Sequence, residues 1–161
     1  MKNYSIEIKW ALRFTLLTLA WAIGEKLTGL HDAHVDKYNL YSIFFIIPAA
    51  LFYFLAINEK KKHFFNGSMS WSQGFVSGVI LSFFIALLNP FAQYAIFEGI
   101  SPDFFHKIIE YKIKNGNIPL KNAQSYFSIK TIMLVSTFTY LSMGIVAGAI
   151  ISYFLKNKSD E

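Results

Sequence analysis

Residues 38–57 read YNLYSIFFIIPAALFYFLAI, a run of twenty residues without a charged side chain. A helix that crosses the roughly 30 Å hydrocarbon core of a bilayer needs about 20 mostly apolar residues. This stretch therefore predicts a transmembrane helix. Pro48 within it predicts a kink, because proline cannot donate the backbone hydrogen bond of a helix interior.

Three further stretches have the same apolar character. The first of them carries Arg13, Glu25 and Lys26, and the second contains Asn89-Pro90, which we expect to bend or end its helix. The predicted fold class is all-α: a polytopic membrane protein that forms one domain over residues 1–161. Its four transmembrane helices are expected at about residues 10–30, 38–57, 71–97 and 131–155.

The composition also indicates a membrane protein. Hydrophobic residues make up 54% of the chain and charged residues 16%, whereas soluble proteins average about 25% charged. The absence of cysteine excludes disulfides, thiolate catalysis and cysteine-ligated zinc. The net charge of +5 comes from lysines that punctuate apolar runs and form no basic stripe, so the expected partner is a lipid bilayer and not a nucleic acid.

The basic residues favour a cytoplasmic location for both termini. This orientation divides the 15 Lys and Arg residues eight to seven in favour of the cytoplasmic side. The connector NEKKKHFFNGSMS (58–70) decides the orientation, because its three consecutive lysines lie beside a helix end, where cytoplasmic lysines are most frequent. The N-terminal region resembles a signal peptide around residues 20–22, but apolar sequence continues beyond it, so we expect it to be retained.

The third and fourth predicted helices both carry the pattern G-x-x-x-G-x-x-x-S, which places small residues on one helix face. Small faces let two helix backbones approach closely in lipid. One antiparallel register aligns all of these residues within the chain, and a homodimer through the same faces is the alternative. The expected pairs are Gly74 with Ser152, Gly78 with Gly148, and Ser82 with Gly144.

Residues 101–127 are too polar to cross a bilayer and predict an outer amphipathic segment between helices three and four. Ser101-Pro102-Asp103 has the form of a helix start, with a capping hydroxyl, a proline at the first helical position and an acid in the first turn. Apolar residues at 104, 105, 108 and 109 follow at helical spacing. Residues 115–117 (NGN) end this helix, and a second short helix is expected near 120–127. The segment is either a surface cap or a lid over the outer helix ends.

The stretch GLHDAHVDKY (29–38) lies at the predicted outer surface, between the first two helices. Imidazole and carboxylate groups at this density could bind zinc or another divalent ion. The candidate metal ligands are His31, His34, Asp32 and Glu25.

Two structural expectations accompany this metal site. On a continued helix, His31 and His34 would share a face, and His106 and Glu110 on the outer helix could complete the ligand set. A proton-responsive cluster and a structural hydrogen-bonded cluster are the alternatives. No catalytic residue and no bound organic cofactor are expected, so a divalent metal is the one cofactor in question.

Four segments together resemble a family of small four-helix bacterial membrane proteins known as domain of unknown function 4199. These segments are EKLTGLHDAHVDKY (25–38), NGSMSWSQGFVSG (66–78), ISPDFFHKIIEY (100–111) and MGIVAGAIISYFLKNK (143–158). The resemblance implies an inner-membrane protein of Bacteroidetes-type bacteria. It implies no activity, and no catalytic residue is carried over from it.

The expected function is that of a non-enzymatic membrane component that binds a partner or maintains the envelope. A small transporter or channel is the second hypothesis, as a homo-oligomer, because four short helices leave little interior for a pathway. A metal-binding protein or enzyme that acts at the outer face through His31, His34 and Glu25 is the third.

Overall fold

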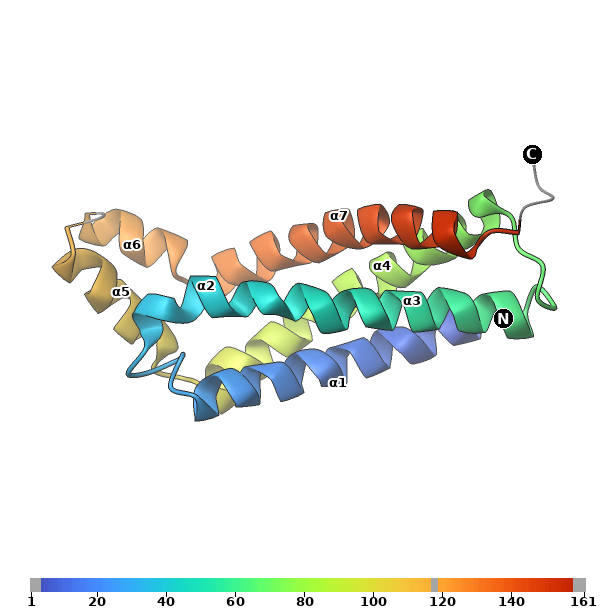
Figure 1. Cartoon of the computed structure of the whole chain (residues 1–161). Coiled ribbons are helices and arrows are strands. Elements are labelled where there is room, and N and C mark those ends of the chain that lie inside the picture. The colour runs from blue at the N-terminus through green and yellow to red at the C-terminus, as the bar shows by residue number, and fades with distance from the viewer. Residues whose placement is uncertain (1–3, 117–118, 158–161) are drawn as a thin grey trace.

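The computed structural model describes residues 4–116 and 119–157, and these residues form helices and turns without a strand. Four long helical segments run side by side, and two short helices cover one end of them (Figure 1). The all-helical prediction is therefore confirmed. The elements are α1 (Ser5–Leu27), η2 (Val35–Lys37), α2 (Tyr38–Ser42), η3 (Ile43–Phe45), α3 (Ile46–His63), α4 (Trp71–Tyr94), η4 (Ala95–Ile100), α5 (Phe104–Lys114), α6 (Leu120–Tyr126) and α7 (Ile129–Leu155).

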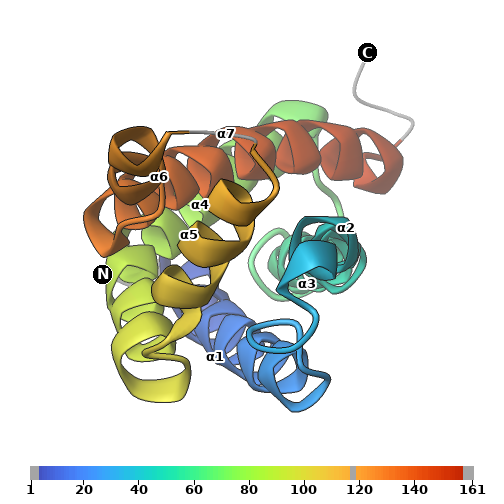
Figure 2. The same cartoon turned by 90° about the vertical axis from the view of Figure 1, so that its left-hand side faces the viewer.

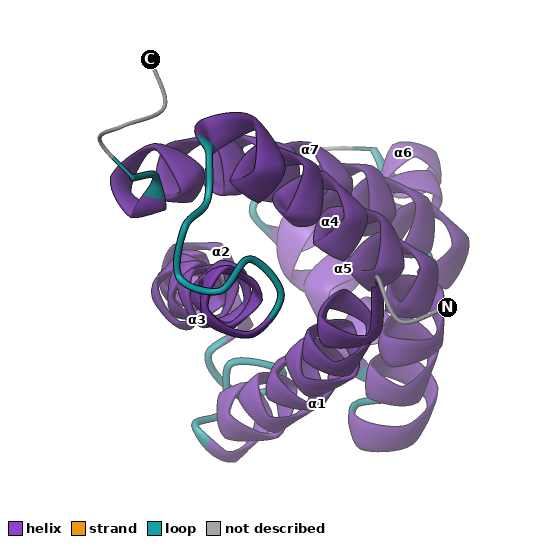
Figure 3. Ribbon diagram, turned by 90° about the vertical axis from the view of Figure 1, so that its right-hand side faces the viewer, coloured by secondary structure: helices purple, strands orange, loops and turns teal. Residues whose placement is uncertain are grey.

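The two ends of the bundle differ in character. The first residues of α1 and the last residues of α7 lie at one end of the bundle, together with the loop between α3 and α4. Figure 3 views the bundle from this end. Figure 2 views the opposite end, where α5 crosses in front of the long helices. We call the end that carries α5 and α6 the cap end, and the other the termini end.

Among the described residues, three helical segments are long and apolar enough to cross a membrane, namely Val35–His63, Trp71–Ile100 and Ile129–Leu155. The second predicted helix is thus longer than residues 38–57, because it continues through the three lysines at 60–62. A short 3₁₀ segment, η3, interrupts it just before Pro48. This fits a proline that leaves the Phe44 carbonyl without its usual helical donor.

Helix α4 has a well-defined start and an unusual end. The Ser70 hydroxyl accepts a bond from the Gln73 amide (3.2 Å), and the Gln73 side chain accepts one from the Ser70 amide (2.9 Å), which forms a capping box. Asn89-Pro90 is expected to bend or end the helix; the second of these alternatives is wrong, since α4 continues through Pro90 to Tyr94. The wider π-helical turns of η4 then follow directly.

Helices α4 and α7 pack through their small residues. A Cβ atom added at Gly74 would lie 2.8 Å from Ser152 Oγ, and one added at Gly78 would lie 2.8 Å from Gly148 Cα. A Cβ at Gly144 would collide with the Ser82 hydroxyl and with that of Tyr53. These are the three pairs of the antiparallel register within one chain. Both serine hydroxyls donate to carbonyls of their own helices, Ser82 to Gly78 (2.7 Å) and Ser152 to Gly148 (2.6 Å).

An aromatic layer fills the middle of the bundle. Phe14 of α1 makes edge-on contacts with Phe45, Phe52, Tyr53 and Tyr140, with ring centroids 5.7–6.4 Å apart. Such edge-to-face pairs add to the stability gained from burial. The buried members of this core are Trp10, Ala11, Phe14, Tyr53, Ala56, Leu81 and Ile85.

The Gly78–Gly148 contact generates the first prediction. Gly78→Ala should lower the free energy of unfolding by about 1–3 kcal/mol, because the added methyl group meets backbone atoms that must move apart. Unfolding in one detergent, followed by circular dichroism, measures the change. Gly99→Ala is the matched control, since a Cβ at Gly99 has no neighbour within 4 Å. Equal destabilisation by the two variants would contradict close packing at Gly78.

Candidate functional site

Helix α1 ends in a turn that places a carboxylate and an imidazole together. The Leu30 amide donates to the Glu25 carbonyl (2.9 Å) and the Gly29 amide to the Lys26 carbonyl (3.0 Å), the two bonds of a Schellman motif. Gly29 has φ of +79°, a conformation that glycine adopts without strain. The chain then turns back, so that His31 points into the bundle and is only 1% exposed.

Three donors surround the Glu25 carboxylate. The Trp21 indole (2.8 Å) and the Ser42 hydroxyl (2.5 Å) both donate to Oε1. His31 Nε2 lies 3.2 Å from Oε2, and His31 Nδ1 lies 2.7 Å from Ser101 Oγ. An ionised carboxylate only accepts hydrogen bonds, so in the tautomer that bonds to ionised Glu25 the proton is on Nε2. Glu25 is 8% exposed, so the cluster excludes most solvent from this carboxylate.

A cavity of about 100 Å³ opens beside the Glu25–His31 pair. Its wall combines aromatic rings with polar groups from α1, α2, α4 and α7, a composition unlike that of the apolar core below it. A water molecule needs roughly 10–15 Å³ on this scale, so the space suits several waters or a molecule of a few heavy atoms. The lining residues are Thr18, Trp21, Ala22, Glu25, His31, Tyr38, Ser42, Phe45, Gln93, Ile96, Phe97 and Tyr140.

Gln93 is held in this wall by a chain of side-chain hydrogen bonds. Its Nε2 donates to Asn89 Oδ1 (3.0 Å), and Asn89 Nδ2 donates to the hydroxyls of Ser136 (2.7 Å) and Thr137 (3.1 Å) on α7. The network therefore fixes one side of the cavity to the α4–α7 pair.

The four candidate metal ligands separate in the structure. Glu25 and His31 meet, whereas His34 is exposed, because the turn at Gly29 prevents the continued helix on which the two histidines would share a face. Asp32 pairs with Lys107 of α5. Within residues 4–116 and 119–157, no three His, Asp or Glu side chains gather in a way that could hold a metal ion.

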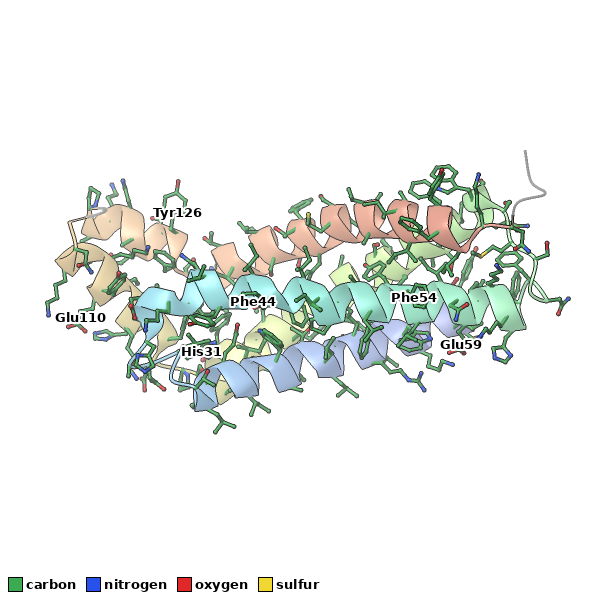
Figure 4. All side chains as sticks on the ribbon, viewed as in Figure 1. His31, Phe44, Phe54, Glu59, Glu110 and Tyr126 are labelled. Carbon is green, nitrogen blue, oxygen red and sulfur yellow. The ribbon has the colours of Figure 1, made fainter. Side chains whose placement is uncertain are left out.

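The outer helix also differs from expectation. Helix α5 begins at Phe104, and its N-cap residue, Asp103, makes no capping bond through its side chain. The Ser101 hydroxyl bonds to His31 instead, so the prediction of a Ser101 cap with Pro102 at the first helical position is wrong. His106 is exposed, and Glu110 lies well away from His31 (Figure 4). The buried face of α5 consists of Phe104 and Ile108.

The Asp32–Lys107 pair ties the first loop to α5. The hydrogen bond from Lys107 holds the pKa of Asp32 below its ordinary value of 3.8, and the same bond raises the pKa of Lys107. A carboxylate with a lowered pKa stabilises the folded form above its unfolded pKa, and this contribution is lost as the pH falls through the folded value. The tie therefore acts at neutral pH and fails only in strong acid.

A buried ion pair lies at the termini end. Lys60 Nζ lies 2.9 Å from Glu7 Oε1, and the Ser77 hydroxyl donates to the same oxygen (2.7 Å). Glu7 is 1% exposed and Lys60 is 5% exposed. Sequence reasoning missed this cluster: it began the first helix after Glu7 and treated Lys60 as a cytoplasmic loop residue. A lysine separated from an acid by 53 residues offers no spacing signal.

A family model described as "Protein of unknown function (DUF4199)" matches residues 9–157. The chain belongs to the DUF4199 family. This match confirms the resemblance of the four sequence segments to that family. No curated protein and no solved structure matches this DUF4199 chain.

The Asp32–Lys107 tie predicts a specific titration. Lys107→Gln should raise the pKa of Asp32 towards 3.8, because the variant loses both the hydrogen bond and the positive charge. Carboxyl carbon NMR of Asp32 measures the pKa directly. Lys112→Gln is the matched control on the same helix, where Lys112 lies beside the ring of Tyr111. An unchanged Asp32 titration in Lys107→Gln would contradict the tie.

Proposed function

We propose that this DUF4199 protein is a four-span, non-enzymatic component of the bacterial inner membrane with both termini in the cytoplasm. Three segments have the length and hydropathy of membrane helices, and α1 is proposed as the fourth. Two observations support α1. Leu12, Leu16 and Ile23 are exposed on its outer face, while its carboxylates Glu7 and Glu25 turn inward to partners. Polar residues of membrane helices face the bundle interior in the same way.

The topology is tested by cysteine labelling, since the chain has no cysteine of its own. Single variants Tyr4→Cys and Ser68→Cys should react with an impermeant maleimide only after the inner membrane is opened. Ala33→Cys and Ser125→Cys should react in intact spheroplasts. All four residues are exposed. If Tyr4→Cys instead reacts from the same side as Ala33→Cys, α1 does not cross the membrane.

We infer that the function of the protein is to bind a small organic ammonium ion in the cavity beside Glu25. The observation that carries this inference is a carboxylate set among aromatic rings inside the bundle, those of Trp21, Tyr38 and Tyr140 among them. Aromatic faces attract cations, most strongly where water is excluded. A buried carboxylate adds a full opposite charge, whose attraction increases as the local dielectric constant falls.

The hydrogen-bond count at Glu25 leaves room for such a ligand. A carboxylate offers about four lone-pair sites. Three of them are directed to Trp21, Ser42 and His31. An ammonium N–H can use the fourth, and the volume of about 100 Å³ suits an ion of the size of methylammonium.

The arrangement around the cavity supports the binding of a ligand better than ion conduction or a hydrolytic reaction. The aromatic layer around Phe14 lies between the cavity and the Glu7–Lys60 pair at the other end, so apolar rings separate these two polar clusters of the described residues. Ser101 hydrogen-bonds to His31 as a nucleophile would, but it does not line the cavity. A bound substrate would therefore contact Glu25 and His31, but not the hydroxyl.

Methylammonium chloride should raise the melting temperature of the purified protein in a concentration-dependent way. A ligand at 100 times its Kd stabilises a protein by about 2.7 kcal/mol. Glu25→Gln should abolish the shift, because it removes the charge and keeps the shape of the side chain. Glu98→Gln, an exposed residue of η4, should retain it. Sodium chloride at the same ionic strength controls for salt, and equal shifts in the two variants would overturn the assignment of the cavity.

A further inference from the structure

A second hollow lies on the surface of the bundle, and Trp21 and Glu25 line both this hollow and the cavity. It is a groove of about 660 Å³ between α1 and the α2–η3 segment. Its walls are mainly apolar, and its polar residues gather at the cap end. The lining residues are Leu17, Ala20, Trp21, Gly24, Glu25, Thr28, Leu30, His34, Lys37, Tyr41 and Phe44.

The groove has the length of one leaflet of a bilayer. From Leu17 to Thr28 the α1 axis rises about 16 Å at 1.5 Å per residue. Half of a hydrocarbon core of roughly 30 Å is about 15 Å. If α1 crosses the bilayer as proposed above, the apolar residues Leu17, Ala20 and Phe44 lie at acyl-chain depth, while Lys37 lies at the level of the headgroups.

Gly24 gives the groove its depth. A Cβ at this position would have no atom within 4 Å, so the space in front of α1 is open there. Tyr41 and Phe44 on the opposite wall are about half exposed. The groove is therefore open and mainly apolar, and the aromatic rings of Tyr41 and Phe44 line the wall opposite α1.

We propose that this groove binds one phospholipid of the leaflet at the cap end, with an acyl chain between α1 and α2–η3 and an anionic headgroup at Lys37. The charges that line the groove fit this occupant. Lys37 and His34 stand at its headgroup end, and Lys26 is turned away to the Ile100 carbonyl. Glu25 is the one carboxylate among the lining residues, and its oxygens are directed to Trp21, Ser42 and His31. This proposal does not depend on ammonium binding in the cavity.

Trp21 is a built-in reporter of this site, since it lines the groove. The chain has three tryptophans, so Trp10→Phe/Trp71→Phe leaves Trp21 as the sole fluorophore. Phospholipids brominated on their acyl chains quench tryptophan on contact. We expect brominated phosphatidylglycerol, titrated into phosphatidylcholine nanodiscs, to quench Trp21 in a saturable curve that is half-complete at a low mole fraction. Brominated phosphatidylcholine should quench only in proportion to its mole fraction.

Two variants in the same background separate the parts of the site. Gly24→Leu should fill the groove and reduce saturable quenching several-fold, because its side chain occupies the position of the acyl chain. Lys37→Gln should leave the groove intact and remove the preference for the anionic lipid. Gly99→Leu is the matched control, because it also adds a side chain in open space but lies outside the groove.

Native mass spectrometry of the unmodified chain provides the second measurement. One phosphatidylglycerol should remain bound to the wild type and to Gly99→Leu, and should be lost from Gly24→Leu. Quenching that is linear in mole fraction and equal in all variants overturns the proposal. Trp21 fluorescence that no brominated lipid reaches also overturns it, since a protein segment would then fill the groove.

Discussion

The burial of two carboxylates on α1 is the constraint on which the rest of the architecture depends. Hydrocarbon supplies no hydrogen-bond donors, so if α1 crosses the membrane as proposed above, its two buried carboxylates must be satisfied by protein. Glu7 is satisfied by Lys60 and Ser77 from α3 and α4. Glu25 is satisfied by Trp21, His31 and Ser42. Each carboxylate therefore ties α1 to other elements, one at each end of the bundle.

The two ends use their polar groups differently. At the termini end the ion pair is compact and closed by Ser77, and Lys60 also lies 4.1 Å from the ring of Phe64. At the cap end the polar residues surround open space, with the aromatic layer around Phe14 below. A closed ion pair orients helices, whereas a cavity beside a carboxylate can accept a guest. This asymmetry is the reason to locate binding at the cap end.

The sequence was sufficient to predict those features that depend on spacing along one helix. The glycine and serine positions of α4 and α7 define their faces by themselves, and the apolar positions of α5 define its buried side. Predictions were poorer where a side chain has two competing partners. Ser101 has the sequence context of a helix cap, but its hydroxyl instead hydrogen-bonds to the buried imidazole of His31, 70 residues away. His31 and His34 look equivalent until the positive φ of Gly29 turns one inward and leaves the other outside.

The separation of Glu7 from Lys60 has a consequence for biogenesis. The two residues are 53 positions apart, so the ribosome completes α1 well before α3 exists. Until then Glu7 lacks the lysine with which it pairs in the folded chain. Glu25 differs, because Trp21 and His31 are within six residues of it. The Glu7–Lys60 pair can therefore form only after α3 has been synthesised, whereas the contacts of Glu25 with Trp21 and His31 can form while α1 and the turn after it are being made.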